Sequence, residues 1–437
     1  MIGVGIIGLG TVGMGTYRIL TGHESLIRER TGLDIRVVRI AEIDPSKTKG
    51  KGIGRGIITA DAMELIHDNR VDIVVELIGG TRSAQELITA ALGLGKPVVT
   101  ANKALLAEKG DELFRLAEKK GCEIGYEASV CGGIPVIRAI REGLVGDELT
   151  YILGILNGTS NYILSRMTEE GISFDEALKG AQLKGYAEKD PTFDVEGTDA
   201  AHKLSILVRL AFATPVAMDR IATRGISKID PVDIGFARDF GYKIKLLAIA
   251  KKSGTSGGKP GDGGIEARVE PAMIPVDHPL SSVNGVYNAV YVVGNMVGPS
   301  LFYGRGAGSE PTGSAVVSDI VDIAKRINVP DHRISYPGLR TVGRYKESKG
   351  SAIPYYLRVM TQDRPGVLSR ISGVLADYKI SISAVTQKGR KESGHVPIVM
   401  VTHEAPEKDL KKAMEEINSL PFVKGESVHI RIEEGNL

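Results

Sequence analysis

The first residues of this 437-residue chain restrict its fold more than any other stretch. An apolar run, IGVGII (2–7), leads directly into GLGTVG, in which Gly8, Gly10 and Gly13 have the spacing G-x-G-x-x-G. A helical pattern follows to about residue 30, so the glycines lie between a strand and a helix. In that position the first glycine permits a tight turn and the second lets the backbone approach a pyrophosphate. The third allows close packing of helix and strand.

The glycine loop therefore predicts a dinucleotide-binding site. A helix N-terminus offers free amide donors and a partial positive charge. We expect the backbone around Thr11 and Val12 to contact the phosphates. The alternative is a glycine turn that binds no ligand.

Four charged side chains near the second strand leave the choice of dinucleotide open. The run IRVVRIAEID (35–44) ends in Glu42 and Asp44, and such acids bind the ribose hydroxyls of NAD. Arg39 and Lys47 could instead face the 2′-phosphate of NADP. The acids favour NAD slightly, and NADP remains open.

Short apolar runs alternate with helical patterns in the first third of the chain. The runs at 71–80, 97–103 and 122–130 are separated by amphipathic stretches. This alternation is typical of a parallel, doubly wound sheet. We therefore predict a Rossmann domain over residues 1–134, to which the chain returns around 306–335.

The rest of the chain indicates two further units. Residues 135–305 mix helices and strands, with a glycine-rich stretch at 251–264 that is typical of a hairpin tip or linker. We predict an α+β domain for catalysis and dimerisation there. After a loop-rich connector, residues 350–437 follow the order βαββαβ of a small ferredoxin-like domain. The whole chain is thus of the α/β class.

Composition makes several classes of partner improbable. A formal charge of +2 gives no reason to expect nucleic acid or an anionic membrane as partner. No apolar run approaches the ~20 residues that span a bilayer. Two cysteines rule out a disulfide framework, and the N-terminus lacks a signal-peptide pattern. We expect a cytoplasmic enzyme.

The segment KGYAEKDPTFDVEGTDAAHK (184–203) crowds charge immediately before the apolar run LSILVRLAF. With Thr198 as the N-cap of a helix, Asp199 and Lys203 are four residues apart and share one face. The plain alternative is a surface ion pair worth under ~1 kcal/mol. The apolar continuation and the upstream carboxylates favour a buried polar site, because clustered carboxylates repel one another and a bound ammonium group would relieve that repulsion.

Five segments, in order along residues 1–330, resemble the homoserine dehydrogenase family. They are VTANKALLA (99–107), YEASVCGGIPVI (126–137), NGTSNYIL (157–164), the charged segment at 184–203, and GRGAGSEPTGSAVVSD (304–319). The C-terminal TQDRPGVLSRISGVLADYKISISAVTQ resembles an ACT domain, a small amino-acid-sensing fold. The resemblance implies nicotinamide-dependent, reversible reduction of aspartate semialdehyde to homoserine, a step of threonine, methionine and isoleucine biosynthesis.

The resemblance also implies roles for single residues. It makes Lys203 the proton donor and Lys103 the second lysine at the reacting carbonyl, where developing negative charge needs a cation. Gly306 is expected to contact the cofactor. The substrate-binding residues that it implies are Gly185, Glu188, Asp194 and Asp199.

A monovalent cation site, for sodium, is implied in the same way. Its ligands would be Glu127 and the backbone carbonyls of Val130, Gly132 and Ile134. One carboxylate with several carbonyls is the hard-oxygen shell that an alkali ion accepts. The residues themselves leave open a second interpretation, in which Glu127 is hydrogen-bonded to backbone amides of the turn.

The ACT resemblance implies regulation. A small amino acid would bind near the strand-to-helix turn at 363–368, at an interface between two copies, and threonine is the natural effector. The alternative is a plain dimerisation module. We expect a homodimer or homotetramer.

Two other functions are compatible with parts of the sequence. Cys131 could be the nucleophile of a semialdehyde dehydrogenase, with His202 as its base. A lone cysteine in a turn is more often inert. The chain could also be an amino-acid-sensing binding protein with an inactive dehydrogenase, although the complete set of lysines and acids argues against this.

Overall fold

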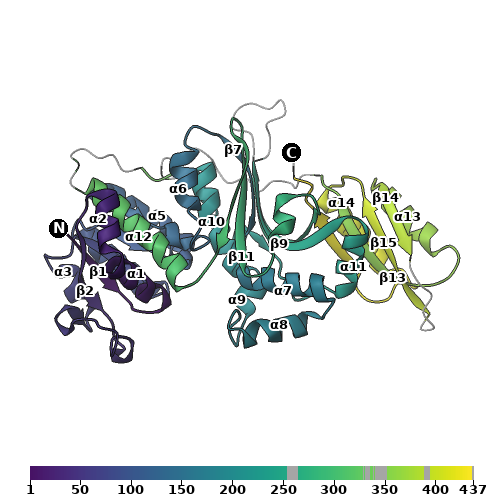
Figure 1. Ribbon diagram of the computed structural model, residues 1–437. Coiled ribbons are helices and arrows are strands. Elements are labelled where there is room, and N and C mark those ends of the chain that lie inside the picture. Colours follow the sequence, from purple (N-terminus) through teal and green to yellow (C-terminus); the bar gives the residue numbers. More distant parts are fainter. Residues whose placement is uncertain are drawn as a thin grey trace.

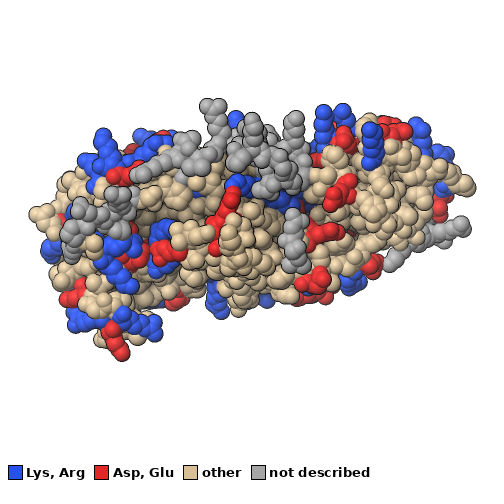
Figure 2. All heavy atoms as spheres, turned by 90° about the horizontal axis from the view of Figure 1, so that it is seen from above, with Lys and Arg blue, Asp and Glu red and all other residues tan. Residues whose placement is uncertain are grey.

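The molecule is elongated, with three parts in a row (Figure 1). The N-terminal part and helix α12 lie at one end, the yellow C-terminal part at the other. On the face in Figure 2, basic and acidic side chains are interspersed. None of the described helices is long and apolar enough to cross a membrane. The computed structural model describes residues 1–252, 264–327, 329, 335–337, 339, 352–387 and 394–435.

The N-terminal part contains a six-stranded parallel sheet in the order β3-β2-β1-β4-β5-β6. This is the doubly wound Rossmann order, in which ligands bind at the carboxyl ends of the strands where the strand order reverses, here between β1 and β4. The fold predicted for this part is confirmed. The strands are β1 (Ile2–Ile7), β2 (Ile35–Ala41), β3 (Ile58–Thr59), β4 (Ile73–Glu76), β5 (Val98–Thr100) and β6 (Ile124–Gly125).

Helices cover both faces of this sheet, and one of them comes from much later in the chain. Helix α12 (Ser309–Arg326) packs against α1 (Thr11–Gly22). A Cβ at Gly15 would lie 2.1 Å from the Ser309 carbonyl oxygen, so only glycine permits this contact. The helix predicted up to residue 30 is interrupted at His23. The other helices are α2 (Glu24–Thr31), α3 (Ala62–His67), α4 (Arg82–Gly93) and α5 (Lys103–Lys120).

The middle part is built on an antiparallel sheet in the order β12-β11-β7-β9-β10, with the short strand β8 parallel to β10. β9 and β10 pair antiparallel from Lys252 and Ile265 onward, and residues 253–263 of the predicted glycine-rich loop lie outside the described residues. The strands are β7 (Leu149–Ile155), β8 (Ala222–Thr223), β9 (Tyr242–Lys252), β10 (Ile265–Pro275), β11 (Tyr287–Gly294) and β12 (Gly298–Arg305). The helices are α6 (Val136–Arg138), α7 (Gly158–Glu170), α8 (Phe174–Leu183), α9 (Thr192–Val195), α10 (Thr198–Phe212) and α11 (Pro231–Asp239).

The C-terminal part has the predicted βαββαβ order and an antiparallel sheet, β16-β13-β15-β14. Its edge strand β16 also pairs parallel with β10, so this sheet and the middle sheet are continuous. Most of the predicted connector at 332–351 lies outside the described residues. The elements are β13 (Tyr355–Gln362), α13 (Val367–Asp377), β14 (Ile382–Gln387), β15 (His395–Thr402), α14 (Glu407–Asn418) and β16 (Val428–Ile432).

Lys245 on β9 is buried, and its titration should make the free energy of unfolding depend on pH. Its ammonium donates to the Val283 carbonyl at 2.6 Å and to Asn161 and Asn284. Burial, with a smaller contribution from the charge of Lys243, lowers the pKa of Lys245 to about 7. Between that pH and the ordinary lysine pKa the unfolded chain binds more protons than the folded one, so stability rises with pH.

We therefore expect the wild type to gain about 2 kcal/mol in unfolding free energy relative to Lys245→Met between about pH 7 and 9. Urea unfolding of both proteins at the two pH values measures this difference. Parallel pH dependence of the two proteins would contradict it.

Candidate active site

The glycine loop follows β1 directly and has the geometry that its sequence predicts. Gly8 has φ +94°, a left-handed conformation that favours glycine. A Cβ at Gly13 would lie 2.0 Å from the Gly8 carbonyl oxygen, so the loop and the helix can meet only through a glycine. Above Gly10 the space is open, since a Cβ there would have no neighbour within 4 Å.

The first amides of α1 are free to bind a ligand. Gly10 is the N-cap and brings no capping side chain, and the first helical hydrogen bond runs from the Met14 amide to the Gly10 carbonyl. The amides of Thr11, Val12 and Gly13 therefore have no acceptor within the helix. Together with the open space above Gly10, this arrangement fits a pyrophosphate.

Two cavities extend from this loop along the carboxyl ends of the strands. One of about 400 Å³ is lined by Gly8, Gly10, Glu42 and Lys47 among others. The other, of about 310 Å³, lies beyond the switch point and reaches Lys103. A dinucleotide has two nucleoside halves on either side of its pyrophosphate, and the two cavities provide a place for each.

Glu42 is already engaged by the backbone. Its Oε2 accepts from the Leu9 amide at 2.7 Å and its Oε1 from the Asp44 amide at 2.9 Å. Glu42 thus braces the glycine loop, and its carboxylate is less available to a ribose than the sequence indicated. Arg39 turns away to Glu64. Lys47 lines the cavity beside Glu42, with its Nζ 3.5 Å from Glu42 Oε1.

Lys103 and Lys203 converge on one carboxylate. Lys103 Nζ lies 2.7 Å from Asp199 Oδ1, and Lys203 Nζ lies 2.7 Å from Asp199 Oδ2. Lys203 also donates to the Leu156 carbonyl at 2.7 Å. Residues about a hundred positions apart thus meet at a single point, where the Rossmann part faces the middle part.

Two helix starts place these side chains. Lys103 is the first residue of α5, just after β5, and the Asn102 side chain caps that helix by accepting from the Leu105 amide. The expected cap of α10 is wrong by one residue: Gly197, with φ +86°, is the N-cap and Thr198 begins the helix. Asp199 and Lys203 then share one face of α10, as their spacing predicts.

Asp199 and the lysines beside it stabilise each other's charged forms. Burial raises the pKa of Asp199, but the ammonium groups of Lys203 and Lys103 outweigh this and hold the pKa well below its ordinary value. Burial lowers the pKa of Lys203, but the charge of Asp199 more than compensates and raises it above its ordinary value. The pKa of nearby Asp194 is raised, by burial and by the Asp199 charge. Lys203 therefore remains cationic beside an ionised Asp199.

A cavity of about 470 Å³ opens beside this cluster. Of the residues implied for the substrate, Gly185, Asp194 and Asp199 line it together with both lysines, and Gly306 lines it too. Glu188 is exposed and lies outside the cavity lining, so the structure does not bring it to the site.

Several polar residues of the cavity had no role assigned from the sequence, among them Asn157, Asn288 and Arg305. Asn157 caps α7 and donates to both Asp194, at 2.7 Å, and Asp199, at 2.8 Å. Arg305 adds a guanidinium, and Asn288 donates to the Leu156 carbonyl at 2.8 Å. An asparagine just before the helix of NGTSNYIL is a typical helix-cap signal, but nothing in the sequence indicates that the Asn157 amide bridges two aspartates.

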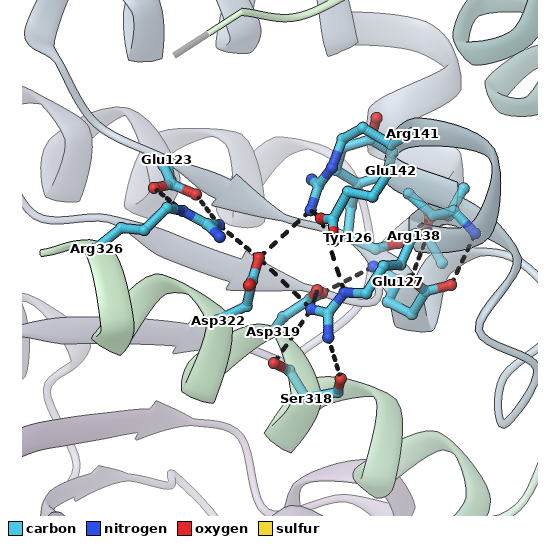
Figure 3. A network of polar contacts seen from close by, with 12 residues as sticks. Glu123, Tyr126, Glu127, Arg138, Arg141, Glu142, Ser318, Asp319, Asp322 and Arg326 are labelled. Carbon is cyan, nitrogen blue, oxygen red and sulfur yellow. Dashed lines mark hydrogen bonds and ion pairs between the residues drawn. The ribbon is translucent and has the colours of Figure 1, made fainter. Parts of the chain in front are cut away.

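Glu127 belongs to a buried polar network between α6 and α12, shown in Figure 3. Its two carboxylate oxygens accept from the amides of Ile137 and Arg138, each at 2.8 Å. Its own amide donates to Asp319 at 2.8 Å, and Arg138 also approaches Asp319. This is the second interpretation of Glu127 that its sequence left open.

Those contacts leave acceptor capacity for a cation without requiring one. Each Glu127 oxygen accepts one of these hydrogen bonds and keeps a further lone pair. Within the described part of the chain, no backbone amide donates to the Val130 or Gly132 carbonyls, whereas the Ile134 carbonyl accepts from Val136 at 2.8 Å. Oxygens of this kind suit a hard cation.

Cys131 is buried and unsuited to nucleophilic attack. Burial raises the pKa of its thiol to about 11, so it is protonated at neutral pH. The base proposed for it, His202, packs its ring against Phe193 instead, with centroids 5.5 Å apart. We expect Cys131→Ser to keep kcat within about threefold of wild type, measured as cofactor oxidation. A loss of more than about a hundredfold would restore the nucleophile hypothesis.

Comparisons with known proteins cover the whole chain. Family models match at residues 8–127 (homoserine dehydrogenase, NAD binding domain), 135–321 (homoserine dehydrogenase) and 355–422 (ACT domain). A homoserine dehydrogenase of Pseudomonas aeruginosa is 43% identical, with 99% of each chain covered. The crystal structure of one from Thiobacillus denitrificans superposes with a TM-score of 0.92 at 44% identity, covering 99% of this chain and 98% of that one.

A more distant structure bears on the cofactor. It is a hyperthermophilic archaeal homoserine dehydrogenase in complex with NADPH, 28% identical, with a TM-score of 0.62. It covers 74% of this chain and 98% of its own.

Proposed function

The chain belongs to the homoserine dehydrogenase family, and from this membership we propose how its residues carry out the reaction. The observation that carries the proposal is the single carboxylate, Asp199, that holds two lysine ammonium groups 2.7 Å from its oxygens. A bound nicotinamide dinucleotide supplies the hydride that reduces the aldehyde carbon of aspartate semialdehyde. The side chains of the cavity bind the substrate and supply the proton.

Lys203 is the proton donor in this proposal. As the aldehyde carbon gains a hydride, its oxygen becomes an alkoxide, which is far more basic than an amine. A lysine whose pKa is held above its ordinary value still gives its proton to such an oxygen. Lys103, more exposed than Lys203, adds a second positive charge that stabilises the developing negative charge.

The other polar groups of the cavity suit the two ends of the amino acid. Asp194 and Asp199 can accept hydrogen bonds from the substrate ammonium group, while the Asn157 amide holds both carboxylates in place. Arg305 can bind the substrate carboxylate, because a guanidinium pairs with a carboxylate through two parallel hydrogen bonds. Glu188 stays a predicted substrate residue.

We assign the 2′-phosphate of NADPH to Lys47. Glu42 is occupied by two backbone amides and Arg39 by Glu64, which leaves Lys47 as the cation at the cavity near β2. We expect Lys47→Gln to raise the KM for NADPH about tenfold and to leave the KM for NADH nearly unchanged. Steady-state rates with aspartate semialdehyde and each cofactor measure this.

A matched control for Lys47 is Lys51→Gln, an exposed lysine outside the cavity lining, which should change neither KM. Equal losses with both cofactors in Lys47→Gln would assign this lysine to a part that NADH and NADPH share. Absence of turnover with either cofactor in the wild type would overturn the proposed reaction itself.

Two further roles complete the proposal. A sodium ion is held by Glu127 and the carbonyls of Val130, Gly132 and Ile134, bracing the turn that joins the first two parts. The ACT domain mediates feedback by a small amino acid, with the turn at 363–368 as the site expected from the sequence. A dimer or tetramer provides the interface between two ACT domains.

A further inference from the structure

Strands β8 and β16 reach the same edge of β10 and leave a gap between them. β8 pairs with β10 near Val269, whose carbonyl accepts from the Arg224 amide at 2.8 Å. β16 pairs near Met273, whose carbonyl accepts from the Glu433 amide at 2.8 Å. Pro271 lies midway between Val269 and Met273. Its backbone faces the same edge, because the N–H and C=O groups of every second residue point to the same side of a strand. A proline has no amide to donate, so neither strand can continue across it.

Pro271 at this gap lines a cavity of about 510 Å³ between the middle part and the ACT domain. It has no lining residue in common with the active-site cavity. Its lining comes from three segments: Glu196; Thr223, Arg224, Gly225, Ser227, Lys228 and Ile229 around β8; and Glu426, Ser427, Val428, His429 and Ile430 at β16, with Pro271 beneath.

Charges of both signs line this cavity, and several lack partners. Lys228, Glu196 and Glu426 make no ion pair or side-chain hydrogen bond within the described part of the chain. The Ser427 hydroxyl is buried and likewise has no partner among the described residues. Arg224 spans the gap, donating to the His429 carbonyl at 3.3 Å and pairing with Glu270 at 3.2 Å.

Such a lining favours a ligand that carries both charges. Lys228 and Arg224 suit a carboxylate, and Glu196 and Glu426 suit an ammonium group. The hydroxyls and the apolar Ile229 and Val428 suit a short side chain. A small α-amino acid has all three features.

The wall of this cavity is also the support of the active-site helix. Glu196 lies three residues before Asp199, at the junction of α9 and α10. The Ile226 amide donates to the Val195 carbonyl at 2.8 Å, and a Cβ at Gly225 would lie 2.5 Å from the Glu196 Cα. The segment after β8 is therefore in direct contact with the α9–α10 junction.

We propose that this cavity binds a small α-amino acid and that its occupant acts on the active site through the α9–α10 junction. The ACT domain contributes β16 to the site, and the catalytic part contributes the rest. One chain is sufficient to form it, unlike the site expected at the turn 363–368. Binding here does not depend on the roles proposed for the lysines; only the coupling uses the junction.

Calorimetry on the full chain with L-serine, L-threonine and L-valine tests the binding. We expect saturable binding of at least one of them in the millimolar range or below. N-acetylation or methyl esterification of that amino acid should abolish it, because each removes one of the two charges. No saturable binding of any of the three, or equal binding of the blocked forms, would overturn the proposal.

Two variants locate the site. Lys228→Gln and Glu426→Gln change unpartnered side chains and should each weaken binding roughly tenfold or more, since charge-assisted hydrogen bonds are lost. The matched control is Lys408→Gln, an exposed lysine on α14 outside the cavity lining, which should bind as the wild type does. Arg364→Gln alters the turn at 363–368 instead and should leave binding at this cavity unchanged. Binding lost in Arg364→Gln but kept in the two cavity variants would place the amino acid at the turn and overturn the proposal.

Hydrogen exchange measures the coupling between the cavity and the active-site helix without an assay of turnover. Adding the bound amino acid should slow amide exchange at residues 192–203 as well as at 223–229 and 426–430. Slower exchange only around 363–368, with 192–203 and the cavity segments unchanged, would contradict both the site and the coupling.

Discussion

Lys203→Ala is expected to lower kcat by about 100- to 10,000-fold while NADPH still binds. The ammonium of Lys203 is buried, and it donates to Asp199, which lies one turn earlier on the same helix. Removing it takes away the proton donor and one of two charges beside the aldehyde oxygen, and general acid catalysis contributes a factor of this size. Stopped-flow or steady-state rates of NADPH oxidation give kcat, and fluorescence titration gives the dissociation constant of NADPH.

Lys203→Arg separates chemistry from charge. An arginine keeps the positive charge beside Asp199 but does not release its proton, so kcat should remain low. Cys131→Ser, a neighbouring buried substitution, should stay near wild type. Near-normal kcat in Lys203→Ala would mean that another group supplies the proton, with Lys103 the first candidate.

Arg431→Ala is expected to destabilise the protein by about 3–5 kcal/mol, because it removes a buried cation that three carboxylates share and leaves that cluster with excess negative charge. Arg431 on β16 is 2% exposed and lies 3.0 Å from Glu266 and 3.1 Å from Glu270, both on β10. Its Nε is 2.9 Å from Glu433, which also pairs with Lys251 at 2.6 Å. Urea unfolding measures the loss.

The matched control is Arg82→Ala. Arg82 pairs with Glu86 at 3.5 Å on an exposed helix face, and such a pair contributes under about 1 kcal/mol. Losses of similar size in both variants would show that Arg431 does not stabilise the junction of the two sheets.

The same contacts bear on removal of the ACT domain. Deleting residues 350–437 removes β16 and exposes the edge of β10. It also removes Arg431, so Glu266 and Glu270 each lose one ion pair. We expect the shortened chain to be less stable than Arg431→Ala and prone to association through that edge. The sequence predicted the βαββαβ order of residues 350–437, but no pattern in it indicated that β16 also pairs with β10.

Local sequence patterns predicted the glycine turn and the face of α10, because both depend only on residues close together in the sequence. GLGTVG predicted a turn that needs left-handed backbone at Gly8 and a close approach at Gly13, and both are present. The spacing of Asp199 and Lys203 predicted a shared helix face. The resemblance added Lys103, which no local pattern connects to Asp199. Glu42 was one of two acids considered for a ribose, because its position in the sequence cannot reveal that two backbone amides donate to its carboxylate.

The sequence by itself determined the class of fold, the family and the chemical kind of the active site, because periodicity and motif spacing act over a few residues. Only the tertiary structure decided which groups meet: two lysines on one Asp199, Asn157 between two aspartates, and β16 against β10. These contacts join elements that are far apart in the sequence. They depend on how the elements pack, which is determined by shape and burial over the whole molecule. For the same reason, the gap at Pro271 and the charged cavity beneath it have no signature in the sequence.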